Sequence, residues 1–214
     1  MAPSRTVGLP YHLGYPIVSI VFLAIAAFSS ADSVWYVSVA TSSEVIRFAS
    51  ENYCGYTVAN LVITSKLGCI FRGWQYQIPG GYFGFDIPND INLNLGKAVV
   101  TSVVAFSFVL VTGVLHAYTI RYSFRLSPEP NKDRLYSLVQ IHLLTVSLCL
   151  LFTWCSFIAQ AAIVGHAVSQ SNNLVTDGGI AIYWGQSVWL VLASAIVHFP
   201  WCYEAVRWRA ALLK

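Results

Sequence analysis

Charge is missing from four long stretches of this chain. No Asp, Glu, Lys or Arg occurs in residues 6–31, 98–120, 135–176 or 178–203. A bilayer has a hydrocarbon core about 30 Å thick and a helix rises about 1.5 Å per residue, so a span needs about 20 mostly apolar residues. Only 10% of the residues are charged and 57% are hydrophobic, which leaves too little polar surface for a soluble domain of this size. The sequence therefore predicts an all-α membrane protein built on four transmembrane helices.

The usual signatures of catalysis are missing too. No H-E-x-x-H, G-x-S-x-G, P-loop or dinucleotide-binding glycine pattern occurs in the sequence. No charged residue lies in the middle of a predicted span, which argues against an ion-coupled transporter. There is no basic run, so nucleic acid is not an expected partner. We therefore expect a non-catalytic protein without a cofactor.

The ends of the uncharged stretches place the helices at about residues 13–33, 98–120, 136–168 and 180–203. Within lipid the backbone of each segment must satisfy its own hydrogen bonds, which favours helix. An alternative concerns the first span. The apolar run 17–28 and the small residues 29–31 also resemble a signal peptide, whose removal would leave three spans.

The cations report the orientation of these spans. They concentrate in the short loop between the second and third helices and in the C-terminal tail: Arg121, Arg125, Lys132, Arg134, Arg207, Arg209 and Lys214. The opposite side is longer, and acidic residues dilute its cations. By the positive-inside rule both termini are cytoplasmic, and we expect the protein in the plasma membrane.

The segment 34–97 between the first two helices differs in composition from the spans. Residues 34–39, 56–64 and 69–78 are rich in β-forming side chains, and Gly, Pro and Asn punctuate them at 65–68, 79–81 and 88–90. This pattern predicts a small extracellular antiparallel sheet of three or four strands on the outer face of the bundle. An isolated hairpin is marginally stable, so a further constraint is expected.

Cys54 and Cys69 are the cysteines of this outer segment, which faces an oxidising compartment in the predicted topology. A disulfide between them would close a loop of about 15 residues and stabilise the fold by roughly 3 kcal/mol. The alternative is a pair of free or metal-binding thiols. Cys202 lies at the predicted inner interface and is a candidate for palmitoylation.

Several of these features occur together in one known superfamily. The chain has Trp35 just after the first helix, the Cys54/Cys69 pair around a predicted hairpin, a short inner loop, and a third helix longer than a bilayer requires. This arrangement resembles the claudin-like tetraspan superfamily, which includes claudins, peripheral-myelin-type proteins, calcium-channel gamma subunits and fungal pH-response membrane proteins. The resemblance implies a structural, adhesive or regulatory role, in contact with lipid and with other membrane proteins or further copies of the chain.

Aromatic side chains are the candidate partner-binding residues of the outer segment, because Tyr, Trp and Phe are enriched in protein interfaces. They are Trp35, Phe71, Trp74, Tyr76, Tyr82, Phe83 and Phe85. The alternative is that these rings pack the sheet against the bundle or the headgroup layer.

Histidine supports a second class of function. His116, His142 and His198 lie at similar depth near the cytoplasmic ends of their predicted helices. Histidines on neighbouring helices ligate haem b or a transition metal in some membrane redox proteins. The simpler interpretation is interhelical hydrogen bonding. A third alternative, an oligomeric channel or pore subunit, has no distinguishing residue in the sequence.

Overall fold

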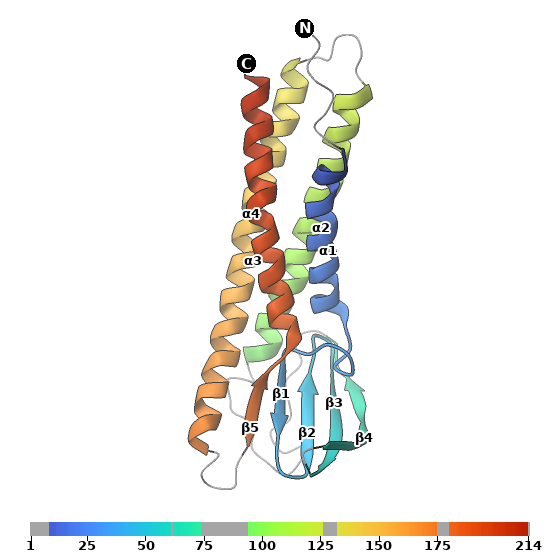
Figure 1. The fold of residues 1–214 in the computed structure, drawn as a ribbon, viewed down its shortest axis with the longest axis vertical. Helices are drawn as coiled ribbons and strands as arrows, with labels where there is room; N and C mark the ends of the chain where they lie inside the picture. Colours follow the sequence, from blue (N-terminus) through green and yellow to red (C-terminus); the bar gives the residue numbers. More distant parts are fainter. Residues whose placement is uncertain (1–8, 61, 74–93, 126–131, 175–179, 214) are drawn as a thin grey trace.

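Four long helices and a five-stranded sheet make up the described part of the chain, which in this computed structural model is residues 9–60, 62–73, 94–125, 132–174 and 180–213 (Figure 1). The helices are α1 (Leu9–Phe28), α2 (Gly96–Arg125), α3 (Lys132–Leu174) and α4 (Gln186–Leu212). The strands are β1 (Val37–Ala40), β2 (Glu44–Phe48), β3 (Asn52–Ala59), β4 (Val62–Phe71) and β5 (Ala181–Trp184). The sheet lies at one end of the helices, and the C-terminal end of α4 lies at the other.

The helices α2, α3 and α4 are long and apolar enough to cross a membrane. Their outward faces carry exposed aliphatic side chains such as Val111, Leu144 and Ile196, which are 67%, 62% and 53% exposed. Apolar helix faces of this kind are suited to contact with lipid. The structure is therefore that of an integral membrane protein. The apolar part of α1 among the described residues, Leu13–Phe28, is shorter than the other three.

The outer end of the first helix differs from the prediction. We expected helix to about residue 33, but α1 ends at Phe28. Beyond it, the Ala31 amide donates to Asn52 Oδ1 at 2.9 Å, and Asn52 Nδ2 donates to Ser30 Oγ at 2.8 Å. Bonds to the start of β3 thus replace helical bonds, and the chain turns into the sheet.

The start of the fourth helix was also predicted wrongly. We expected helix from about residue 180, but Ala181–Trp184 forms β5, which pairs antiparallel with β1 in the register Val37↔Trp184 and Val39↔Ile182. The segment between α3 and α4 therefore contributes a strand, whereas the sequence predicted a sheet from the segment between the first two helices alone. Gly185 follows β5, and any side chain there would overlap the Trp35 carbonyl, so this close approach requires glycine.

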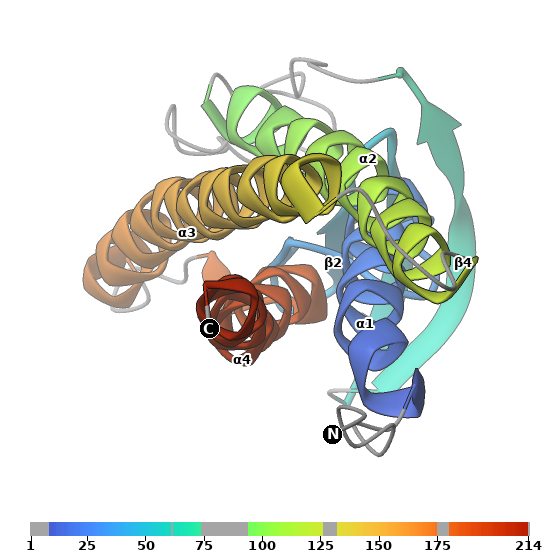
Figure 2. The ribbon, with the colours of Figure 1, turned by 90° about the horizontal axis from the view of Figure 1, so that it is seen from above.

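The hairpin between β3 and β4 turns earlier than expected. The predicted break at 65–68 lies inside β4, and the chain reverses after Ala59, where Asn60 has φ 53°. Asparagine tolerates this left-handed backbone better than most residues. The β3–β4 ladder has register shifts between Gly55 and Tyr56 and between Thr57 and Val58. Such irregularities increase the local twist, and in Figure 2 β4 extends beyond the outline of the helices.

One face of the sheet packs on the helices. The strand order is β4-β3-β2-β1-β5, and residues such as Val39, Ile46 and Phe48 form a core with Val164 and Ala167 of α3. At about 1.5 Å per residue, the 43 residues of α3 span roughly 64 Å, about twice the hydrocarbon thickness. The C-terminal part of α3 therefore supports the sheet, while the rest lies in the bundle.

A buried polar network joins the sheet to the bundle. The Tyr36 hydroxyl donates to the Ala26 carbonyl of α1 at 2.9 Å and contacts Ser102 Oγ of α2 at 3.1 Å. Gln160 of α3 donates to the same Ser102 oxygen at 2.7 Å. Since all these side chains are buried, the network fixes the linker after α1 relative to three helices.

Candidate functional site

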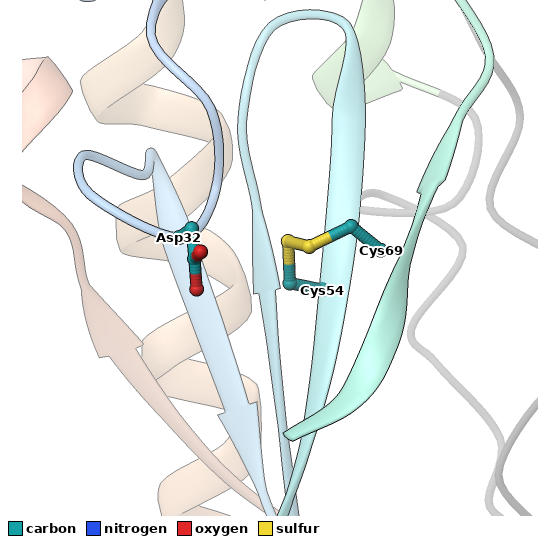
Figure 3. Close-up of side chains that lie close together, drawn as sticks. All are labelled: Asp32, Cys54 and Cys69. Atoms are coloured by element: carbon teal, nitrogen blue, oxygen red, sulfur yellow. A yellow bond between two sulfur atoms is a disulfide. The ribbon is translucent and has the colours of Figure 1, made fainter.

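The disulfide predicted between Cys54 and Cys69 is present. It joins β3 and β4, which lie at the end of the strand order opposite β5. Cys54 of β3 and Cys69 of β4 are directly opposite each other, with their Cα atoms 4.1 Å apart. Figure 3 shows the bridge between the strands, with Asp32 nearby on the linker that follows α1. A covalent link at this position holds the outermost strand to the rest of the sheet.

A carboxylate beside the disulfide organises the neighbouring side chains. Asp32 accepts a hydrogen bond from the Tyr56 hydroxyl at 2.6 Å and forms an ion pair with the Lys66 ammonium at 2.6 Å. These two partners hold the pKa of Asp32 below its ordinary value. Burial, together with the bond to Asp32, raises the pKa of Tyr56 to about 12, so Tyr56 stays a neutral donor at physiological pH.

Arg47 completes this surface from the centre of the sheet. Its Cζ atom lies 3.9 Å from the centroid of the Trp35 ring and 4.8 Å from that of Tyr56. A guanidinium over two aromatic faces is favoured electrostatically and keeps those rings fixed. We call this set of five side chains the Arg47 patch: Trp35, Arg47, Tyr56, Asp32 and Lys66.

The Arg47 patch combines charged, aromatic and phenolic side chains of different exposure. Asp32 and Lys66 are exposed, Trp35 and Arg47 are half-buried, and Tyr56 is buried. Asp32, Cys54 and Cys69 bring potential ligand atoms within 4.8 Å of one another, and among the described residues they are the group with metal-like spacing. The sulfurs are bonded to each other, however, so they are not thiolate ligands while the disulfide is intact.

Of the predicted aromatic partner-binding residues, Trp35 and Phe71 lie in the described part of the chain. Trp35 is half-buried within the Arg47 patch, and Phe71 is 69% exposed at the end of β4. The remaining residues of that set lie outside the described part of the chain: Trp74, Tyr76, Tyr82, Phe83 and Phe85.

Sequence reasoning missed the exposed apolar side chains of β4. Val62, Ile63 and Leu67 are 64%, 41% and 51% exposed, and together with Phe71 they define what we call the β4 surface. The sequence contained only part of the information needed to predict the β4 surface. The residues are β-forming, but their exposure depends on where the strand order places β4, at the end of the described sheet.

Two of the three candidate haem ligands contact each other directly. His116 Nδ1 and His142 Nε2 are 2.7 Å apart, a hydrogen-bonding distance, and both side chains are buried. The Trp201 indole N–H donates to the same His116 nitrogen at 3.4 Å. Since an indole only donates, His116 Nδ1 is assigned as the acceptor and His142 Nε2–H as the second donor.

The third histidine belongs to a separate pair of helices. His198 Nδ1 is 2.7 Å from the Ser194 carbonyl, which only accepts, so this nitrogen carries the proton. Its Nε2 lies 3.5 Å from Ser19 Oγ of α1, and Ser19 Oγ is 2.5 Å from Ser194 Oγ. The chain of bonds ties α1 to α4.

A metal or haem iron does not fit between His116 Nδ1 and His142 Nε2. Two imidazole nitrogens on opposite sides of one metal are about 4 Å apart, because each metal–nitrogen bond is about 2.0 Å long. The 2.7 Å separation of His116 and His142 leaves no room for such an ion, and the Trp201 ring packs within 6.1 Å of both imidazole centroids. The arrangement suits interhelical hydrogen bonding.

The palmitoylation candidate Cys202 is half-buried, and its Sγ lies 3.7 Å from Ser147 Oγ of α3.

Comparison with protein-family models and with curated proteins finds no match to this chain.

Proposed function

We propose that this chain is a four-span membrane protein of claudin-like architecture that acts without catalysis, as an adhesion component or regulatory subunit, by binding a partner membrane protein through its outer sheet. In this proposal α1 is the fourth span, both termini are cytoplasmic, and the sheet projects from the plasma membrane. The exposed β4 surface is the observation that carries the proposal.

The architecture supports this assignment in three ways. The disulfide lies across a hairpin between α1 and α2, α3 extends past the bundle to support the sheet, and Trp35 lies in the linker between α1 and β1. Each of these features belongs to the pattern on which the resemblance rests. α1 is 20 residues long, enough for one span, and exposes Ile17, Val21 and Phe28 as a lipid-facing helix would.

The outer sheet offers the side chains that interfaces use. Aromatic residues and arginine are enriched among residues that dominate binding energy, and Phe71, Trp35 and Arg47 are of these types. Exposed apolar side chains are a feature of interaction sites, and β4 carries four of them along its length: Val62, Ile63, Leu67 and Phe71. Rim charges such as Asp32 and Lys66 would contribute orientation and specificity.

Site-specific photo-crosslinking in the native membrane tests the proposal. A photoreactive residue at Leu67 or Phe71 is expected to yield a discrete protein adduct, because both side chains point away from the protein interior. The same probe at Ser42, which is exposed between β1 and β2, is the matched control and should yield little. The double substitution Leu67→Ser/Phe71→Ser should abolish co-purification of that adduct's partner. Equal adducts at all three positions, or none at β4, would reject the proposed interface.

A further inference from the structure

The two halves of the disulfide differ in their exposure to solvent. Cys54 of β3 is 0% exposed and packs in a small cluster with Ala31, Ala49 and Tyr56. Cys69 of β4 is exposed. A thiolate in solution therefore has access to the disulfide from the side of Cys69, and the packed cluster protects Cys54.

The strand that carries Cys69 is held loosely. Among the described strands, β4 stands at the end of the strand order and is exposed along most of its length. Its ladder with β3 has two register shifts. Segments with few buried contacts open at the lowest cost in free energy, so β4 has room to move when the Cys69 sulfur is attacked.

Opposite charges lie on either side of the two sulfurs. Arg47 of β2 is the register partner of Cys54, and register partners in an antiparallel pair place their side chains on the same face of the sheet. A cation on this face stabilises a thiolate released at Cys54. Asp32 acts in the opposite sense, because a carboxylate oxygen lies within 4.8 Å of both sulfurs. Its ion pair with Lys66 offsets only part of that charge.

We propose that the Cys54–Cys69 disulfide exchanges with a small-molecule thiol, with Cys69 as the sulfur attacked, Cys54 as the leaving group, and the Asp32 carboxylate slowing the attack. The incoming thiol loses its proton to water, and its sulfur forms a new S–S bond with Cys69 Sγ. The Cys54–Cys69 bond breaks, its electron pair remains on Cys54 Sγ, and this thiolate takes a proton from water. The thiol is oxidised and Cys54 is reduced, so no further oxidant is required.

Exchange at Cys69 would free β4 from its covalent link to β3 while leaving the helices unchanged. It is independent of the partner proposed for the outer sheet, because it requires only the two sulfurs and a thiol.

Peptide mapping of the full chain in detergent micelles tests which sulfur is attacked. The oxidised protein is incubated with reduced glutathione at pH 8 in the absence of oxygen, quenched with acid, and analysed by mass spectrometry. We expect glutathione on Cys69 at least ten times as often as on Cys54. The free and exposed Cys155 of α3 is the internal control and should carry none, because two thiols form no disulfide without an oxidant. Equal adducts on Cys54 and Cys69, or a disulfide that opens only after denaturant unfolds the protein, would overturn the proposal.

A second measurement tests the part assigned to Asp32. Asp32→Asn removes a like charge close to the attacked sulfur and should raise the rate of opening by glutathione about fivefold at 0.01 M salt. The increase should shrink at 1 M salt, where charges are screened beyond about 3 Å. Asp133→Asn, which makes the same change at the start of α3, should leave the rate at the wild-type value. An increase of equal size at both salt concentrations would come from looser packing and would overturn the role of the carboxylate.

Discussion

Asp32 connects three parts of the molecule around the sheet through a single carboxylate. It lies in the linker after α1, accepts a bond from Tyr56 of β3 and pairs with Lys66 of β4. The same linker carries Trp35, which stacks on Arg47 of β2. One acidic side chain therefore positions the linker, the hairpin and the arginine of the Arg47 patch.

The stability of the sheet should depend on pH through Asp32. Its folded-state pKa lies below the ordinary value of 3.8, so the ionised carboxylate stabilises the folded protein above that pH. This contribution is lost as the pH falls through the folded-state pKa. Asp32→Asn should lower the midpoint of thermal unfolding at pH 7, and the difference from wild type should shrink below about pH 4. Asp133→Asn, at the opposite end of the molecule, is the control. A difference that persists unchanged at low pH would contradict the ion-pair explanation.

Gly185 should tolerate no side chain. A Cβ atom there would overlap the Trp35 carbonyl and crowd its ring, whereas a Cβ atom at Gly14 of α1 would meet nothing within 4 Å. Gly185→Ala is expected to destabilise the protein by about 1–3 kcal/mol, as overpacking does. Gly14→Ala should be neutral or stabilise it slightly, because alanine favours helix. Equal unfolding midpoints for the two variants would show that the linker moves freely away from Gly185.

At the scale of elements, the β3–β4 hairpin is the least supported part of the sheet. Among the described strands, β4 pairs with β3 alone and lies at the edge of the sheet, and it is exposed along most of its length. The irregular β3–β4 hydrogen-bond ladder and the charge of Lys66 both disfavour pairing of β4 with a further strand. A partner would therefore contact the side chains of β4 rather than its backbone. The disulfide compensates for this weak support.

Removing the disulfide should loosen the hairpin without unfolding the bundle. In the chain-entropy model a closed loop of 15 residues is stabilised by about 3 kcal/mol. Cys54→Ser/Cys69→Ser should therefore make β4 sensitive to limited proteolysis, while the helical signal in circular dichroism stays at the wild-type value. Cys155→Ser, a change at an exposed free cysteine of α3, is the control. A double variant as resistant to protease as wild type would mean that packing alone holds β4.

At the scale of the molecule, α3 is the element common to both halves. It packs with α2 and α4 in the bundle and continues along the sheet, where Val164 and Ala167 join the sheet core. Because β5 precedes α4 directly and β1 follows α1 through a short linker, the two halves share one hydrophobic framework. Motion of the sheet as a rigid unit would have to break the Tyr36–Ser102–Gln160 network.

The proposed topology predicts which residues face the outside of the cell. A membrane-impermeant maleimide should label Ser42→Cys in intact cells, because this position lies on the sheet. It should label Ala210→Cys, at the exposed end of α4, only after permeabilisation. Ser4→Cys should behave like Ala210→Cys if α1 spans the membrane. Labelling of Ser4→Cys from outside would leave three spans.

Local properties of the sequence were enough to predict the class of protein. Uncharged stretches and helix lengths depend on the composition of each segment, and α2, α3 and α4 lie where those stretches predicted them, although each helix is longer or shifted at its ends. The disulfide was predictable as well, because Cys54 and Cys69 are the cysteines of the outer segment. The transmembrane helices are predictable because charge is costly in lipid, and the disulfide because its compartment is oxidising. Both causes act on residues that are close together in the chain.

Only the tertiary structure decided which residues meet. Ala181–Trp184 is as apolar as a helix end and becomes a strand because β1 pairs with it. The rotation of α2 and α3 brings His116 against His142, a contact that leaves no space for a metal, and the strand order leaves β4 at an edge. Strand pairing and helix rotation join residues far apart in sequence, so no local pattern encodes them.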